Sequence, residues 1–182
     1  MKRITIGGIG NVLTGDDGVG PYLVRMLDRQ FKFSDDVQVV DFGTPGLDFV
    51  VHIANLDALL LVDAVDNDKP TGSVSVYTKE EIMAGPMPMR LDPHQPALKE
   101  SLWVADVDGS APREVKLIGI TGEDYKFGHR LTPAVRAAVQ EATAILLKEL
   151  DALGATYTRK EDQPVEELWW ETLDIEMLEA KA

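Results

Sequence analysis

The sequence contains no cysteine among its 182 residues. Disulfide bonds, thiolate catalysis and metal sites built on cysteine ligands are therefore excluded. No apolar run approaches the roughly 20 residues that a membrane-spanning helix needs, and the first residues, MKRITIGGIG, lack the long apolar stretch of a secretory signal. We expect a cytoplasmic protein that does not insert into a membrane.

Basic residues are also scarce. Lysine and arginine number 18 against 31 aspartates and glutamates, which gives a net charge of -13. Because nucleic-acid backbones and anionic lipid surfaces repel such a chain, and no basic patch interrupts it, we expect no nucleic-acid partner. The fractions of hydrophobic residues (45%) and charged residues (27%) are those of a globular protein.

Short runs rich in β-branched residues alternate along the chain with segments of helical periodicity. This alternation predicts an α/β fold, a three-layer sandwich with a mostly parallel, twisted sheet of about five strands and helices on both faces. The continuous apolar run 58–65 favours a central strand and the alternating run 73–78 an edge strand. Further strands are expected at 3–9, 37–41 and 114–120, and helices at 18–32, through residue 55, and at 132–153.

The last helix is the best defined, because Thr132 is a favoured N-cap residue and Pro133 suits the first helical position. We expect an α/β domain over 1–155 and an acidic extension over 156–182. Residues 160–182 hold eight acidic residues and two lysines, a net charge of -6. Their apolar residues recur at helical spacing, so the extension is expected to dock as an amphipathic helix on its own domain or on a partner.

A glycine-rich turn follows the first predicted strand and contains Asp16 and Asp17. It is not a dinucleotide-binding fingerprint, because Leu13 occupies the place of the third glycine and two carboxylates stand where a diphosphate would bind. Acids at a helix start commonly complement the helix dipole, which is the role we expect for Asp16.

Two further residues have chemistry suited to a site. Asp63 ends the most apolar strand, and ligands of parallel sheets bind beyond the carboxyl ends of strands. His94 lies between Pro93 and Pro96 in an irregular loop. Together with Asp17 they form an incomplete shell of two oxygens and one nitrogen, which suits nickel or zinc and leaves positions open. His52 is expected to be structural or exposed, and His129 is a weaker candidate for the same rim.

These motifs resemble those of the hydrogenase maturation endopeptidases, which trim the C-terminus of the large subunit of nickel–iron hydrogenases. The matching stretches cover roughly residues 3–150, and they are GIGNVLTGDDGVG at 8–20, DFGTPG at 41–46, LLLVDAVD at 59–66, DPHQPAL at 92–98 and GHRLTPAV at 128–135. Family members often have glutamate where this chain has Asp17, which retains the charge on a side chain one methylene shorter.

The resemblance implies that Asp17, Asp63 and His94 contact nickel, and that the substrate precursor carries this nickel, with no organic cofactor. It also implies that Asp41 lies close to the site, and that Asp41, Gly43 and Thr44 bind substrate. Asp17 and Asp41 are candidates for activating the hydrolytic water, and the alternative is that the metal acts as a Lewis acid. Two alternatives stay open from the residues alone: a non-catalytic nickel or metallocofactor chaperone, and a nucleotide-binding α/β enzyme.

Overall fold

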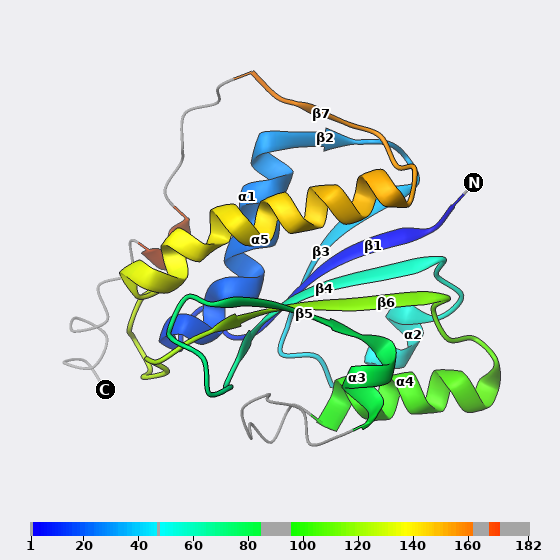
Figure 1. Ribbon diagram of the computed structural model, residues 1–182, viewed down its shortest axis with the longest axis horizontal. Coiled ribbons are helices and arrows are strands. Elements are labelled where there is room, and N and C mark those ends of the chain that lie inside the picture. The colour runs from blue at the N-terminus through cyan, green and yellow to red at the C-terminus, as the bar shows by residue number, and fades with distance from the viewer. Residues whose placement is uncertain (1, 47, 85–95, 162–167, 172–182) are drawn as a thin grey trace.

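A computed structural model describes residues 2–46, 48–84, 96–161 and 168–171. A five-stranded sheet forms the centre of the molecule, with strand order β3-β1-β4-β6-β5 (Figure 1). Its first four strands run parallel, and only the edge strand β5 is antiparallel. The strands span, in chain order, β1 (Ile4–Ile9), β3 (Val37–Gly43), β4 (Ala58–Val65), β5 (Val74–Thr78) and β6 (Glu114–Thr121).

Strand β4 lies in the middle of the sheet, and all eight of its residues are buried. A strand covered on both faces needs apolar side chains throughout, which explains why its sequence does not alternate. The predicted central position of β4 and edge position of β5 are confirmed. Gly8 of β1 pairs with Asp41 on one side and Val62 on the other, so the carboxyl ends of these three strands meet at one edge.

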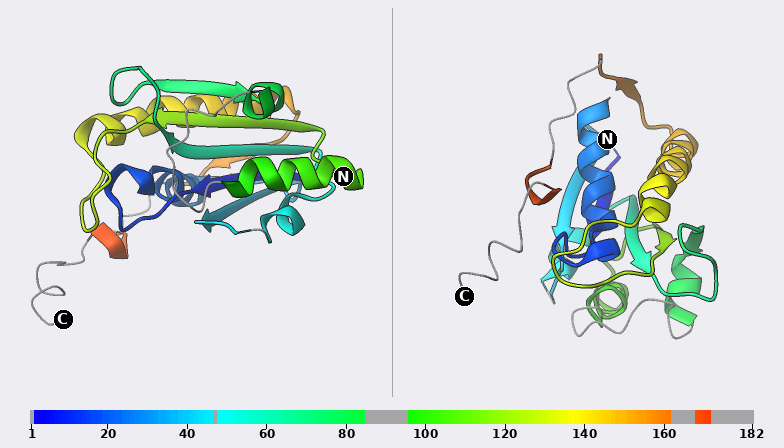
Figure 2. Two further views of the ribbon diagram at one scale, coloured as in Figure 1. Left: turned by 90° about the horizontal axis from the view of Figure 1, so that it is seen from below. Right: turned by 90° about the vertical axis from the view of Figure 1, so that its left-hand side faces the viewer.

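Helices cover both faces of the sheet, as predicted (Figure 2). One layer contains α1 (Val19–Gln30) and α5 (Pro133–Ala152), and the other contains α2 (Phe49–Ile53), α3 (Lys79–Ala84) and α4 (Pro96–Asp108). Each layer encloses its own apolar cluster. Leu60 and Val62 of β4 belong to the cluster under α1 and α5, whereas Leu59 and Leu61 belong to the cluster under α2 and α4.

Helix α5 begins as the sequence predicts. The Thr132 side chain accepts a hydrogen bond from the backbone N–H of Val135, and Pro133 occupies the first turn. Gly154 follows the helix with a φ of +71°, a conformation in which glycine carries no steric penalty.

The helix predicted over 18–32 is shorter in the structure, because Phe31–Phe33 forms a strand, β2, which pairs antiparallel with β7 (Tyr157–Arg159). The rings of Phe31, Phe33 and Tyr157 pack together in this small second sheet. Three-residue strands are too short to produce a recognisable period, which is why the sequence did not predict them. Helices α3 and α4 were also not predicted.

The described part of the acidic extension packs on the α1 and α5 layer. Leu168 is 4% exposed within the apolar cluster of that layer, and a short 3-10 helix, η2 (Trp169–Glu171), follows it. Glu171 forms an ion pair with Arg136 of α5, whose guanidinium also donates a hydrogen bond to the Tyr22 hydroxyl. The remaining predicted positions of the amphipathic helix lie outside the described residues. Within the described ranges, no helix is long and apolar enough to cross a membrane.

Candidate active site at the carboxyl edge of the sheet

The turn after β1 brings Asp17 to the carboxyl edge of the sheet. Residues Gly15–Gly18 form a 3-10 helix, η1, which lies against β4. Asp17 is only 6% exposed, and its Oδ2 accepts a hydrogen bond of 2.8 Å from the backbone N–H of Asn11. This bond holds the carboxylate over the loop that leaves β1.

Glycines allow α1 to approach the sheet closely enough for this arrangement. A Cβ on Gly20 would lie 2.2 Å from the carbonyl oxygen of Ile9 and 2.4 Å from that of Val62. A Cβ on Gly8 would lie 2.3 Å from the carbonyl oxygen of Gly20. Because no side chain fits at either position, the start of α1 rests directly on β1 and β4. The absence of a side chain at Gly20 therefore sets how closely η1 approaches the carboxyl ends of β1 and β4.

Asp63 is a buried carboxylate near the end of β4, with an exposed fraction of 1%. Successive side chains of a strand point to opposite faces. Since Leu59 and Leu61 belong to the cluster under α2 and α4, Asp63 faces that layer too. It is paired across the sheet with Gly119 of β6. A buried carboxylate is costly unless polar or cationic partners compensate its desolvation, which keeps Asp63 a candidate site residue.

Asp41 lies level with Gly8 at the same edge but on the other face of the sheet. Its Oδ1 accepts a hydrogen bond of 3.0 Å from the backbone N–H of Gly43, and its Oδ2 lies 3.6 Å from Nε of Arg25 on α1. Gly43 adopts a φ of +56° and accepts a hydrogen bond from the N–H of Gly10, which ties this turn to the loop after β1. Thr44 is exposed just beyond the turn.

Asp16 has a role beyond the one that the sequence predicted. It is fully buried and caps neither η1 nor α1 with its side chain. Its Oδ1 accepts a hydrogen bond from the N–H of Thr132, and its Oδ2 accepts bonds from the N–H groups of Glu123 and Asp124 and from the Thr132 hydroxyl. Asp16 lies in the first turn of η1, as the dipole prediction requires, and these donors come from a loop more than 100 residues away in the chain. Asp16 anchors η1 to the loop after β6.

His129 is more closely connected to this region than its sequence context indicated. Its Nδ1 lies 2.6 Å from Oδ2 of Asp124, and its carbonyl accepts a hydrogen bond from the N–H of Gly15. The imidazole hydrogen bond, followed by a bond from the N–H of Lys126, lowers the pKa of the Asp124 carboxyl below its ordinary value. His52, in contrast, is exposed on α2 and packs against the ring of Phe42, as expected.

The structure therefore brings the segments of Asp17 and Asp63 together at one edge of the sheet, while His94 lies outside the described residues. Within the part of the chain that the structure describes, no group of three or more acidic or histidine side chains could hold a metal ion. The predicted three-ligand set of Asp17, Asp63 and His94 stays a prediction. Helices α3 and α4, which flank His94 in the sequence, lie in the layer that Asp63 faces.

Comparisons with known proteins agree on the family. Residues 21–149 match the family model described as hydrogenase maturation protease. The hydrogenase expression/formation protein HupM of Azotobacter chroococcum is 35% identical over 160 residues, covering 87% of this chain and 77% of that protein. HupD of Rhizobium leguminosarum is 31% identical, covering 99% of this chain and 90% of that protein.

Among solved structures, the hydrogenase maturating endopeptidase HybD of Escherichia coli superposes with a TM-score of 0.81 at 28% identity. The match covers 88% of this chain and 99% of HybD, so the sheet, its helices and its carboxyl edge are shared nearly throughout. A peptide-bond hydrolase is thereby favoured over the nucleotide-binding enzyme and over the non-catalytic chaperone. The chain belongs to the hydrogenase maturation protease family and is a hydrolase of peptide bonds.

Proposed function

We propose that this protein removes the C-terminal peptide of a nickel–iron hydrogenase large-subunit precursor after nickel has been inserted, and that it recognises the precursor through that nickel. In this proposal the metal arrives with the substrate, and no organic cofactor takes part. Asp17, Asp63 and His94 are the groups that contact the nickel of the bound precursor.

The observation that carries the proposal is the pair of carboxylates, Asp17 and Asp63, buried at the carboxyl edge of the sheet on neighbouring segments. Two buried carboxylates on neighbouring segments, in a chain of net charge -13, make this edge of the sheet negatively charged, which favours a cationic ligand there. Carboxylate oxygens with one imidazole form a donor set that first-row divalent metals accept, and three protein ligands leave positions for the ligands of the precursor.

Selection between precursors follows from this arrangement. A precursor without nickel offers the carboxylates no cationic partner, whereas a loaded precursor gains metal–ligand bonds on docking. The protein therefore binds the loaded precursor more tightly than the empty one, and this difference in affinity is the basis of its specificity. The residues of this chain then orient the C-terminal segment for cleavage.

Hydrolysis requires a group that takes a proton from the attacking water while its oxygen bonds to the scissile carbonyl carbon. The departing amine receives a proton, which balances the step. Asp17 and Asp41 are the two candidate bases. Asp41 lies beside Arg25, on the face of the sheet opposite to Asp63, so a role for Asp41 requires that the peptide reach across the edge of the sheet. Gly43 and Thr44, in the turn after Asp41, are the proposed contacts for that peptide.

Mass spectrometry of a nickel-loaded precursor incubated with the protein tests this proposal. Cleavage is expected as a loss of mass equal to a short C-terminal peptide. Asp63→Asn and His94→Ala should abolish cleavage, whereas Asp66→Asn, the same chemical change at an exposed position of the same strand end, should not. A stable complex of two intact chains would contradict the proposal and would favour a nickel chaperone.

The catalytic base is distinguished by kcat and KM measured over a range of nickel-loaded precursor concentrations. If Asp41 accepts the proton, Asp41→Asn lowers kcat and leaves binding unchanged. If Asp17 serves both as nickel contact and as base, Asp17→Asn lowers kcat and raises KM together.

A further inference from the structure

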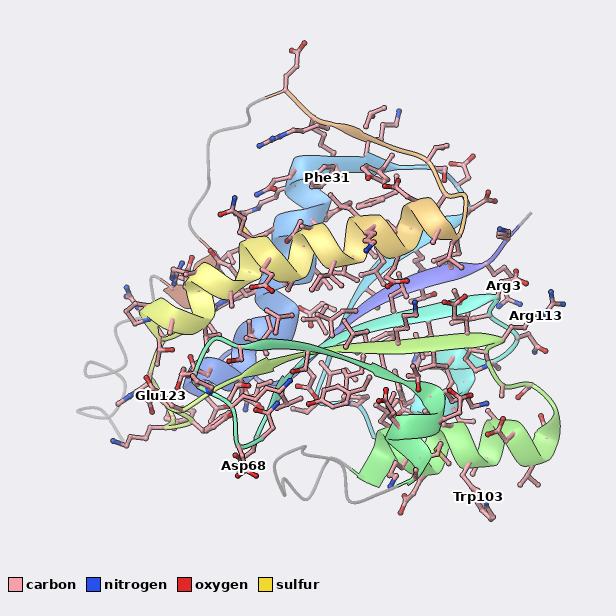
Figure 3. The ribbon with its side chains drawn as sticks, viewed as in Figure 1. Arg3, Phe31, Asp68, Trp103, Arg113 and Glu123 are labelled. Atoms are coloured by element: carbon pink, nitrogen blue, oxygen red, sulfur yellow. The ribbon has the colours of Figure 1, made fainter. Side chains whose placement is uncertain are left out.

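Helix α4 has large apolar side chains on two opposite faces. Leu98, Leu102 and Ala105 pack inward in the apolar cluster under this layer. Trp103, Val104 and Val107 are 61%, 44% and 72% exposed on the other side, and Figure 3 shows the Trp103 side chain pointing away from the body of the protein. A helix that is apolar on both sides is normally covered on both sides.

The three exposed residues form one surface, because positions 103, 104 and 107 lie on the same side of an α-helix. We call Trp103, Val104 and Val107 the α4 stripe. Helix α2, which packs against α4, adds Val51 with an exposed fraction of 74% to the same outer layer. Clustered apolar residues on a surface mark interaction sites, and tryptophan is the residue type that most often dominates the binding energy of an interface.

The position of the α4 stripe connects it to the candidate site. Helix α4 lies in the layer that Asp63 faces, and it starts at Pro96, two residues after His94 in the sequence. The helix then runs towards the amino ends of β4 and β6, where the N–H of Asn55 donates to the carbonyl of Ser110. A protein bound along the α4 stripe therefore covers the same face of the sheet as Asp63, starting from the edge opposite to it (Figure 3). A surface on the opposite layer, over α1 and α5, would not have this relationship.

The charges around the stripe disfavour a second copy of this chain as its partner. Exposed acids, Glu100, Asp106 and Asp108, flank the apolar residues, and of these Asp106 pairs with Lys79 at 2.5 Å. Two copies would bring the same acids together, and each copy has a net charge of -13. A partner with an apolar centre and a basic rim is complementary instead.

We propose that the α4 stripe is a docking surface for the body of the hydrogenase large-subunit precursor, separate from the contacts that nickel and the C-terminal peptide make. This inference rests on the proposed function, since it takes the same precursor as its partner. The stripe supplies affinity for the folded precursor, and the carboxyl edge of the sheet distinguishes the loaded from the empty form.

The test compares the double variant Trp103→Gln/Val107→Gln with Val76→Gln. Val76 is an exposed valine on the edge strand β5, 39% exposed, and it alternates to the face of the sheet opposite to α4. Both proteins change only exposed side chains, and their melting temperatures and circular dichroism should match those of the wild type.

With nickel-loaded precursor, the double variant should raise KM about ten-fold or more and leave kcat within about two-fold, because the stripe does not contact the reacting atoms. Calorimetric titration should show the same loss of affinity for the nickel-free precursor, which separates this surface from the nickel contacts. Val76→Gln should behave as the wild type in both measurements.

Three outcomes would overturn the proposal: an unchanged KM and affinity in the double variant, an equal loss in Val76→Gln, or a dimer of the wild type in sedimentation that the double change dissociates. The proposed function fails separately. If the wild type binds the precursor without cleaving it and the double variant binds more weakly, the docking surface stands and the proposed proteolysis is refuted.

Discussion

The carboxylate of Asp16 accepts a hydrogen bond of 2.7 Å from the backbone N–H of Thr132, a residue 116 positions further along the chain. Thr132 is also the N-cap of α5, so one threonine links the turn before α1 to the first turn of the last helix. Asp17, the next residue, therefore lies in a turn that is hydrogen-bonded to the start of α5. Asp16 is itself fully buried and holds in place the turn that contains Asp17.

Replacement of Asp16 by asparagine should destabilise the fold, because an amide N–H₂ cannot accept the bonds that one of the carboxylate oxygens now accepts. Buried N–H donors would lose their acceptor, at a cost of about 1–3 kcal/mol in the free energy of unfolding. Urea denaturation measures this. Asp68→Asn, the same change in an exposed loop (Figure 3), should alter stability by less than about 0.5 kcal/mol. Equal stabilities of the two variants would refute the anchoring role of Asp16.

Gly20→Ala should also be destabilising, since its new methyl group would meet the carbonyl oxygens of Ile9 and Val62. We expect a loss of about 1–3 kcal/mol as α1 moves away from the sheet. Gly46→Ala is the control, because the nearest atom to its new methyl group is a side-chain oxygen of Asp48 at 3.3 Å. Thermal unfolding of both variants checks this prediction, and a Gly20→Ala protein as stable as the control would contradict the close approach of α1.

The described part of the acidic extension should contribute to the stability of the domain. Leu168→Ala removes a buried side chain from the cluster under α1 and α5, and about 2 kcal/mol or more of unfolding free energy should be lost. Glu161→Ala, at an exposed position of the same extension, should leave stability unchanged. If Leu168→Ala had no effect on denaturant unfolding, the extension would not be docked on its own domain in solution.

The hydrogen bond between Asp124 and His129 should be detectable in the titration of the Asp124 carboxyl group. The hydrogen bond from the imidazole stabilises the charged carboxylate and lowers the pKa of Asp124. The associated stabilisation is present above the ordinary pKa of an aspartate and is lost as the pH falls through the lowered value. Carbon-detected NMR should find that His129→Ala moves the Asp124 pKa up towards its ordinary value. An unchanged titration curve would contradict the hydrogen bond.

Local sequence patterns predicted much of the fold. The continuous apolar run of β4 indicated a buried central strand, and the Thr132 and Pro133 pair indicated the start of α5, because both signals act over a few neighbouring residues. Strands β2 and β7 were missed because each has three residues and depends on a partner more than 100 residues away. Helix α4 was missed because apolar residues on both its faces remove the helical period.

The candidate site was predictable only where its signals are local in the sequence. Asp63 could be identified from its place near the end of an apolar strand, and Asp17 from the glycine-rich turn. The acceptor role of Asp16 could not be foreseen, because its donors belong to the loop after β6 and approach only when the chain has folded. The face of the sheet on which Asp41 lies could not be foreseen either, because the contact with Arg25 of α1 that identifies this face forms only in the folded chain.

The role of nickel is tested most directly by comparing cleavage of nickel-loaded and nickel-free precursor, followed by mass spectrometry, with wild type, Asp17→Asn and the control Asp66→Asn. Wild type and Asp66→Asn should cleave only the loaded precursor at an appreciable rate, and Asp17→Asn should lose most of that activity while remaining folded. Equal cleavage of the two precursors by the wild type would contradict recognition through nickel.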